Sequence, residues 1–184
     1  MAEEKRRYGG RSREDRMAER REKLLRAALS LYARAGREGA SVTAICAEAG
    51  LTTRYFYESF PSHDALLLAL FRGVCGHLVE DLRATREAGG DVLAAFFSAL
   101  AQHAALARLF LADFERQDAG VRAAARDLGA DLTALLAPDA ADPLTGAGAL
   151  GALFRITRLW VEGGHAEPVE HVVTIARRFI RAAG

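Results

Sequence analysis

The chain has 184 residues, of which 51% are hydrophobic and 27% charged, and its formal net charge is +1. These values predict a folded globular protein of one or two domains and exclude a chain that is disordered over most of its length. No apolar run reaches the roughly 18 residues that can span a bilayer, and the charged N-terminus has no apolar signal segment. We therefore expect a cytoplasmic protein without a membrane partner.

Residues 1–12 mix basic and acidic side chains and predict a flexible basic arm, which either contacts a polyanion or remains a solvated tail. The first helix is expected to begin near Ser12 and to end at Gly36. Ser12 and Asp15 have the spacing of a capping box, with Asp in place of the usual Glu. The apolar face of this helix is formed by Leu24, Leu25, Ala28, Leu31 and Tyr32.

Residues 41–60, SVTAICAEAGLTTRYFYESF, predict two short helices joined by a tight turn. The segment opens on a serine that can act as N-cap, and Gly50 lies where a helix C-terminus favours positive φ. Thr52 is the expected N-cap of the second helix. This helix gives most of its positions to hydrogen-bonding side chains and keeps Phe56 as a core anchor. The pattern is typical of a helix-turn-helix whose second helix contacts DNA.

The rest of the chain is predicted to be helical, without β-alternation or internal repeats. A helix long enough to link two domains starts after Ser62, and further helical segments are expected at 106–114 and 121–137. Three more helices are expected to begin at Asp91, Asp142 and Pro168, because these residue types favour the start of a helix. The prediction is an all-α chain of nine helices.

A set of residues in the first 65 or so positions has a recurring spacing: Ala35-Gly36, Val42, Ile45, Ala49-Gly50, Thr52, Tyr57, Phe60, Ser62 and Leu66. This part of the chain resembles the DNA-binding domain of TetR-family transcriptional regulators. The resemblance implies a helix-turn-helix domain at 13–62 and a ligand-binding and dimerisation domain at 63–184. Beyond residue 66 it covers the nine-helix architecture alone.

The resemblance also implies contacts with operator DNA. Tyr57 matches a family tyrosine whose hydroxyl contacts a phosphate, with plain packing as the alternative. Thr53, Arg54 and Tyr55 are the expected base readers, with a solvated surface role as the alternative. Arg54 departs from the Gly of many members, and His63 replaces a Lys, which weakens a phosphate contact near neutral pH. The candidate phosphate contacts besides Tyr57 are Thr43, Thr52 and His63.

The C-terminal helices are expected to hold a small, partly apolar effector and to form a homodimer. Residues proposed for the effector cavity, each with core packing as the alternative, are Leu78, Phe97, His103, Phe110, Phe114, Phe154 and Arg158. The last two helices are expected to form a four-helix bundle with a second copy. Its apolar residues, some facing the partner and some their own core, are Leu153, Trp160, Val161, Val172, Val173 and Ile180.

Enzymatic function is not favoured by the sequence. His77 and Asp81 have i, i+4 spacing but no third ligand at a diagnostic distance, and no phosphate-binding loop or nucleophile motif occurs. Cys46 and Cys75 lack paired spacing and are expected to be reduced, buried thiols. We therefore expect neither a metal nor a cofactor.

The charge is unevenly distributed, because residues 1–64 carry 13 basic and 10 acidic groups, a balance of +3, and residues 65–184 carry 12 and 14, a balance of −2. The N-terminal third is thus the better polyanion binder. The sequence predicts a ligand-responsive DNA-binding regulator, and the family prior favours a repressor released from a palindromic operator by a small molecule. The alternative is a small helical enzyme or carrier with an incidental helix-turn-helix match.

Overall fold

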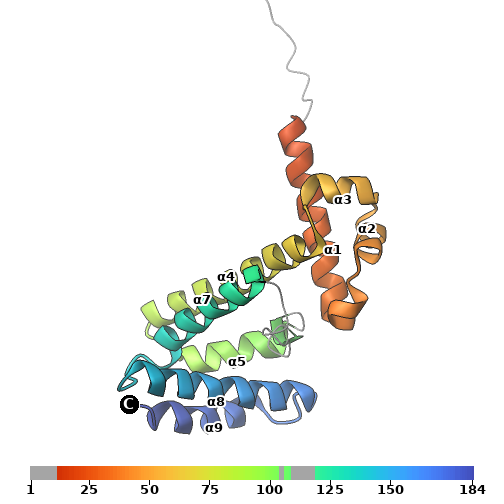
Figure 1. Cartoon of the computed structure of the whole chain (residues 1–184). Coiled ribbons are helices and arrows are strands. Elements are labelled where there is room, and N and C mark those ends of the chain that lie inside the picture. The colour runs from red at the N-terminus through yellow and green to blue at the C-terminus, as the bar shows by residue number, and fades with distance from the viewer. Residues whose placement is uncertain (1–11, 104–105, 109–118) are drawn as a thin grey trace, which may run out of the picture.

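The computed structural model describes residues 12–103, 106–108 and 119–184, and in these residues every regular element is a helix (Figure 1). The helices are α1 (Arg13–Gly39), α2 (Val42–Ala49), α3 (Thr53–Ser59), α4 (His63–Glu87), α5 (Val92–Gln102), α7 (Ala119–Leu136), α8 (Pro143–Glu162) and α9 (Val169–Arg181). The all-α prediction is confirmed. The predicted arm lies outside the described residues except for Ser12, and the segment expected at 106–114 lies mostly outside them.

The capping box predicted at the start of α1 is present. The Ser12 hydroxyl accepts from the Asp15 amide, and the Asp15 carboxylate accepts from the Ser12 amide, both at 2.9 Å. Gly36 has φ +65°, so the regular helix is interrupted at the predicted residue, and the backbone resumes helical geometry as far as Gly39. A positive φ is accessible to glycine at little cost, which explains why the kink falls there.

Helices α2 and α3 pack against α1 as a compact unit at one end of the molecule (Figure 1). Ile45 of α2 and Phe56 of α3 are fully buried, and Gly50 forms the corner with φ +63°. Arg21 of α1 donates to the Ser59 carbonyl at 3.1 Å, where a cation complements the negative end of α3. These contacts fix how α3 is presented on the surface.

The N-caps of α2 and α3 differ from each other. The Ser41 hydroxyl accepts from the Ala44 amide at 3.2 Å, as expected for a capping serine. Thr52 holds the N-cap position of α3, but its side chain makes no capping hydrogen bond. The predicted N-cap position is therefore confirmed, although the Thr52 side chain takes no part in capping. The extended backbone of Thr52 starts the helix, and its carbonyl accepts from the Phe56 amide.

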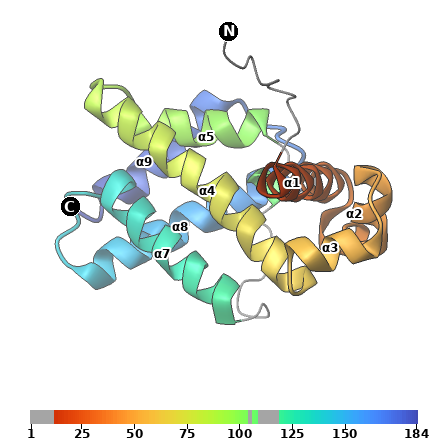
Figure 2. The same cartoon turned by 90° about the horizontal axis from the view of Figure 1, so that it is seen from above.

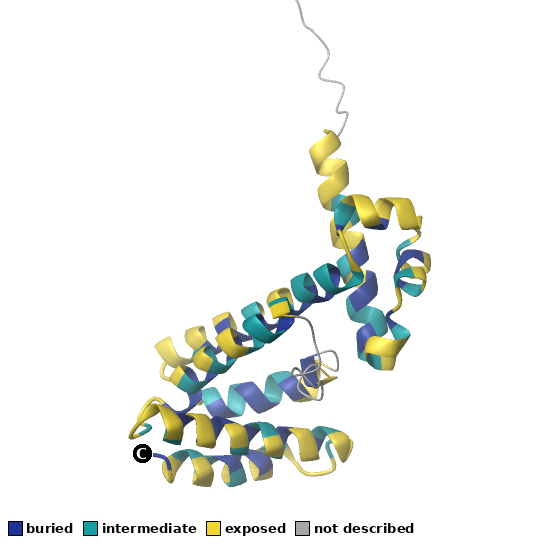
Figure 3. Ribbon diagram, in the orientation of Figure 1, coloured by how far each residue is buried: buried dark blue, intermediate teal, exposed yellow. Residues whose placement is uncertain are grey.

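Helix α4 leads from the N-terminal unit into a layered C-terminal domain, where α4 and α7 form one layer, α5 lies beneath them, and α8 and α9 form the far side (Figures 1 and 2). The buried residues line the facing sides of these helices (Figure 3). Phe96, Phe97, Leu132 and Leu153 are at most 1% exposed. Within the described part of the chain, no helix combines the length and hydropathy needed to cross a bilayer.

Candidate DNA-binding surface and cavities

The outward face of α3 carries side chains that the sequence predicts to contact DNA. Thr52, Thr53, Arg54 and Tyr57 are exposed, with 84% of the Arg54 side chain and 60% of Tyr57 accessible. Phe56 points the other way and is completely buried. The helix is thus anchored by its inner face while its polar residues project to solvent, which is the arrangement that a recognition helix needs to enter a major groove.

A chain of charged contacts ties α3 to α1. The Arg54 Nε lies 3.0 Å from one oxygen of Glu58, and the Arg20 Nη1 lies 3.4 Å from the other. The Arg20 guanidinium also lies 4.4 Å from the centroid of the Tyr55 ring. Glu58 therefore neutralises two arginines beside the predicted DNA-contacting face. Sequence reasoning missed Arg20 and Glu58, because they are 38 positions apart and no local pattern pairs them.

Tyr57 and Tyr55 occupy different environments on α3. The Tyr57 ring meets Phe56 edge-on, with centroids 5.2 Å apart, and its hydroxyl makes no hydrogen bond with a described residue. Tyr55 is only 37% exposed and is covered by the guanidinium of Arg20. The Tyr57 hydroxyl is therefore available to a phosphate, whereas Tyr55 has a packing role in addition to any contact with bases.

His63 and Thr43 flank α3. Thr43 is exposed on α2, and His63 is half-buried at the start of α4, where its Nε2 lies 2.7 Å from the Ala40 carbonyl. Because a carbonyl oxygen only accepts, Nε2 carries the proton in this contact. A neutral ring then presents an unprotonated Nδ1 and can donate nothing further. A hydrogen bond from His63 to a phosphate therefore requires the imidazolium form.

A cavity of about 410 Å³ lies where α1, α4 and α5 meet. Its walls include Leu29 and Ala33 of α1, Leu78 and Asp81 of α4, and His103 after α5. Because α1 belongs to the N-terminal unit and α5 to the C-terminal domain, the cavity is shared between them. We call it the junction cavity.

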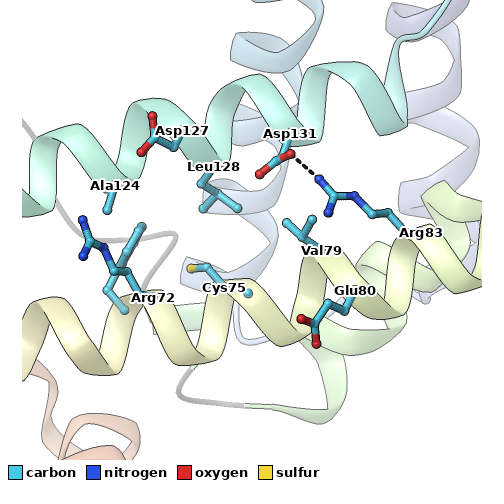
Figure 4. Close-up of a pocket in the computed structure, with 11 residues that line it drawn as sticks. Arg72, Cys75, Val79, Glu80, Arg83, Ala124, Asp127, Leu128 and Asp131 are labelled. Carbon is cyan, nitrogen blue, oxygen red and sulfur yellow. Dashed lines mark hydrogen bonds and ion pairs between the residues drawn. The ribbon is translucent and has the colours of Figure 1, made fainter.

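A second cavity of about 220 Å³ lies between α4 and α7 (Figure 4). Two arginines, Arg72 and Arg83, lie on its α4 side, and Arg83 pairs with Asp131 of α7 at 2.5 Å. Cys75 also lines it, and burial raises the pKa of this thiol to about 12, so the thiol stays protonated at neutral pH. This smaller, more polar space is the α4–α7 cavity.

The N-terminal unit is similar in sequence to a known protein family. Residues 24–70 match the family model of bacterial regulatory proteins, tetR family. Over this range the chain is similar to members of that family. The matched range contains α2, α3 and the parts of α1 and α4 that hold them. No curated protein sequence matches the chain.

Solved structures support the same fold over most of the chain. One is the fatty acid degradation regulator FadR from Bacillus halodurans, with a TM-score of 0.72 at 18% identity, covering 88% of this chain and 94% of that one. FadR from Bacillus subtilis in complex with stearoyl-CoA gives 0.68 at 16%, covering 87% and 95%. The multidrug binding protein EbrR complexed with ethidium gives 0.67 at 21%, covering 88% and 98%. At these identities the likeness concerns the fold.

The effector residues predicted for this chain do not gather in one place. Leu78 and His103 both line the junction cavity. Phe97 is fully buried, with its ring centroid 5.7 Å from that of Trp160, and Arg158 is exposed and paired with Glu162. Phe154 is half-buried, and it lines neither of the two cavities. Phe110 and Phe114 lie outside the described residues.

The residues predicted for the dimer interface lie largely within one subunit. Four are at most 6% exposed in the single chain: Leu153, Trp160, Val172 and Val173. Val161 and Ile180 are half-buried. The large apolar side chains that α8 and α9 expose near their C-terminal ends are Leu159, 53% exposed, and Phe179, 49% exposed. Phe179 follows the same helical period as Val172 and Ala176, so spacing alone did not single it out, whereas Leu159 lies off the buried stripe of α8.

The described residues contain no group of three or more His, Cys, Asp or Glu side chains placed to hold a metal ion. His77, which the sequence pairs with Asp81, has its Nδ1 3.6 Å from the Glu80 carboxylate.

Proposed function

We propose that this protein is a ligand-responsive transcriptional regulator of the TetR family that represses from a palindromic operator. The observation that carries the proposal is the outward face of α3, where Arg54 and the free hydroxyl of Tyr57 project from a helix-turn-helix anchored by Phe56. An arginine of this kind can read guanine, and a tyrosine hydroxyl can fix the register through a phosphate.

The palindrome follows from a homodimer formed through α8 and α9. Leu159 and Phe179 are half-exposed apolar side chains on these helices, and a second copy would cover them across a two-fold axis. Two copies of α3 then address successive major grooves about 34–36 Å apart. The operator is accordingly expected to be an inverted repeat.

Ligand response is supported by the cavities and by the structural relatives. Two proteins with the same fold have structures with a bound small molecule, stearoyl-CoA in FadR from Bacillus subtilis and ethidium in EbrR. The present chain has cavities along α4, the helix that joins its two parts. A ligand that binds one arrangement of these parts better than the other shifts the population and changes DNA affinity.

Selection of bound duplexes from a random DNA pool tests the DNA-binding proposal. We expect the selection to enrich an inverted repeat. The protein should protect both half-sites in a footprint, and the repeat should allow it to repress a reporter promoter in cells. A DNA affinity that changes with salt concentration but is the same for every base sequence would refute specific regulation. Turnover of a small molecule without any enriched site would instead favour the alternative of a helical enzyme or carrier.

The dimer is tested by Phe179→Glu, which places two like charges against each other if the α9 helices meet across the axis. Sedimentation should show a shift towards monomer, with a fall in operator affinity because one half-site is lost. Ala130→Glu is the matched control, since it adds the same charge to an exposed position of α7. A Phe179→Glu protein that stays dimeric would place the interface elsewhere.

A further inference from the structure

We infer that the junction cavity binds a hydrophobic cation and that its occupancy is transmitted to the DNA-binding domain through Arg108 and α1. The binding half of this inference stands on the cavity alone, whereas the transmission half rests on the proposed function.

The position of the junction cavity makes it sensitive to the arrangement of the two domains. Leu29 and Ala33 of α1 form one wall, and Leu78 of α4 and Leu106 form others. A molecule bound there contacts the DNA-binding domain and the C-terminal domain at once. Its affinity therefore depends on how α1 sits against the rest of the chain, which is the condition for a ligand to shift a conformational equilibrium.

The chemistry of the cavity favours a cation with apolar groups. Leucine, valine and alanine side chains form most of its walls. Of the described lining residues, Asp81 carries the formal charge and none is Lys or Arg. The Asp81 carboxylate has no hydrogen bond or ion pair with a described residue. Two histidines, His77 and His103, also line this cavity, and the Nδ1 of His77 lies 3.6 Å from the Glu80 carboxylate.

An anionic effector fits the junction cavity poorly for the same reason. A phosphate or carboxylate there would face the Asp81 carboxylate, and the described lining offers it no lysine or arginine, only the imidazoles of His77 and His103. The α4–α7 cavity offers two arginines, Arg72 and Arg83, beside the carboxylates of Glu80, Asp127 and Asp131 (Figure 4). The two cavities thus differ in whether an arginine lines them.

Arg108 connects this cavity to α1. Its Nε donates to the Ala33 carbonyl at 2.7 Å and its Nη2 to the Arg34 carbonyl at 3.4 Å. These carbonyls belong to the last regular turn of α1 before the break at Gly36, where a cation is stabilised by the helix dipole. The cavity wall and the Arg108 contact therefore share two segments, the turn around Ala33 and residues 106–108. A ligand that separates these segments also strains the hydrogen bonds.

The binding half is tested without DNA, by calorimetry with two lipophilic ions of matched shape, tetraphenylphosphonium and tetraphenylborate. The protein should bind the cation at least about tenfold more tightly than the anion, because Asp81 offers a counter-charge beside the apolar walls of the cavity. Asp81→Asn should remove about tenfold of the cation affinity. The control Asp127→Asn makes the same change at the α4–α7 cavity and should leave the affinity unaltered. Equal affinity for both ions, or equal losses in both variants, would overturn the assignment.

The transmission half is tested by Arg108→Met, which keeps the length of the side chain and removes its donors. In the unmodified protein, saturating tetraphenylphosphonium should change the operator Kd by about 5- to 150-fold. In Arg108→Met this ratio should fall towards one while the cation still binds, and in the exposed control Arg126→Met it should persist. A full ratio in Arg108→Met would overturn the role of Arg108.

The two proposals fail in distinguishable ways. A protein that binds the cation through Asp81 but enriches no DNA sequence would refute the regulator and leave the binding site standing. A protein that binds a defined operator but not the cation would refute the site and leave the regulator standing.

Discussion

Replacing Tyr57 with Phe removes a single hydroxyl from the DNA-binding face and leaves the packing of α3 in place. The ring keeps its edge-on contact with Phe56, and the deleted oxygen has no hydrogen-bond partner among the described residues. The melting temperature should therefore stay within about 2 °C of the original. The effect is expected on DNA binding instead.

The size of the effect follows from the exposure of Tyr57 and from the dimer. Hydrogen bonds to charged groups contribute about 1.5–3 kcal/mol. The Tyr57 side chain is 60% exposed, so we expect its hydrogen bond to contribute less than this range, about 1 kcal/mol of binding free energy for each copy. Two copies on a palindrome lose about 2 kcal/mol, which is about 30-fold in Kd.

Fluorescence anisotropy with operator and scrambled duplexes at one salt concentration measures this loss. A phosphate contact carries no sequence information, so both duplexes should weaken by a similar factor. Tyr32→Phe is the matched control, because it removes the same atom from a ring buried in α1. Unchanged affinity for both duplexes would return Tyr57 to a packing role, and a loss confined to the operator would make it a base reader.

Three further substitutions have defined outcomes. Arg54→Ala should cost about 1–3 kcal/mol on the operator if Arg54 reads a base, and an equal loss on scrambled DNA in the same titration would reduce it to a phosphate contact. Thr157→Val should raise the melting temperature by about 3 °C, since the fully buried Thr157 hydroxyl has no partner among the described residues; an unchanged value by calorimetry would show that it is satisfied. Hydrogen bonds from the Thr145 hydroxyl and amide and from the Leu144 amide lower the pKa of Asp142 below 3.8, so its capping contribution is complete above that pH and is lost as pH falls through the lowered pKa. The difference in melting temperature between the unmodified protein and Asp142→Ala should therefore narrow in acid, and a constant difference would contradict this.

Helix starts could be predicted from sequence because capping is a local interaction. The hydroxyls of Ser12, Ser41 and Ser62 and the carboxylates of Asp91 and Asp142 all accept from amides two or three residues ahead. Thr52 shows where this reasoning ends. Residue preference predicts which side chains can cap a helix, but the side-chain rotamer decides whether one does so.

The polar surface of α3 could be predicted in the same way, since an anchored short helix with one buried Phe56 must expose the remaining residues. The partners of that surface could not. Arg20 meets Glu58 across 38 positions, and Arg108 meets Ala33 across 75. Such contacts depend on how whole helices pack, and a single sequence contains no periodic signal for them. The junction cavity was missed for the same reason, because its walls come from α1 as well as from the C-terminal domain.

Helix α9 shows why an apolar stripe does not identify an interface. Val172, Val173 and Ala176 face the subunit's own core, and Phe179 continues the pattern into solvent. Burial against one's own chain and burial against a partner select the same residue types at the same spacing, so periodicity cannot separate them. Val173→Glu would place a charge inside a folded subunit and test its stability. Phe179→Glu leaves the subunit core intact, so the loss of a dimer in that variant can be assigned to the interface itself.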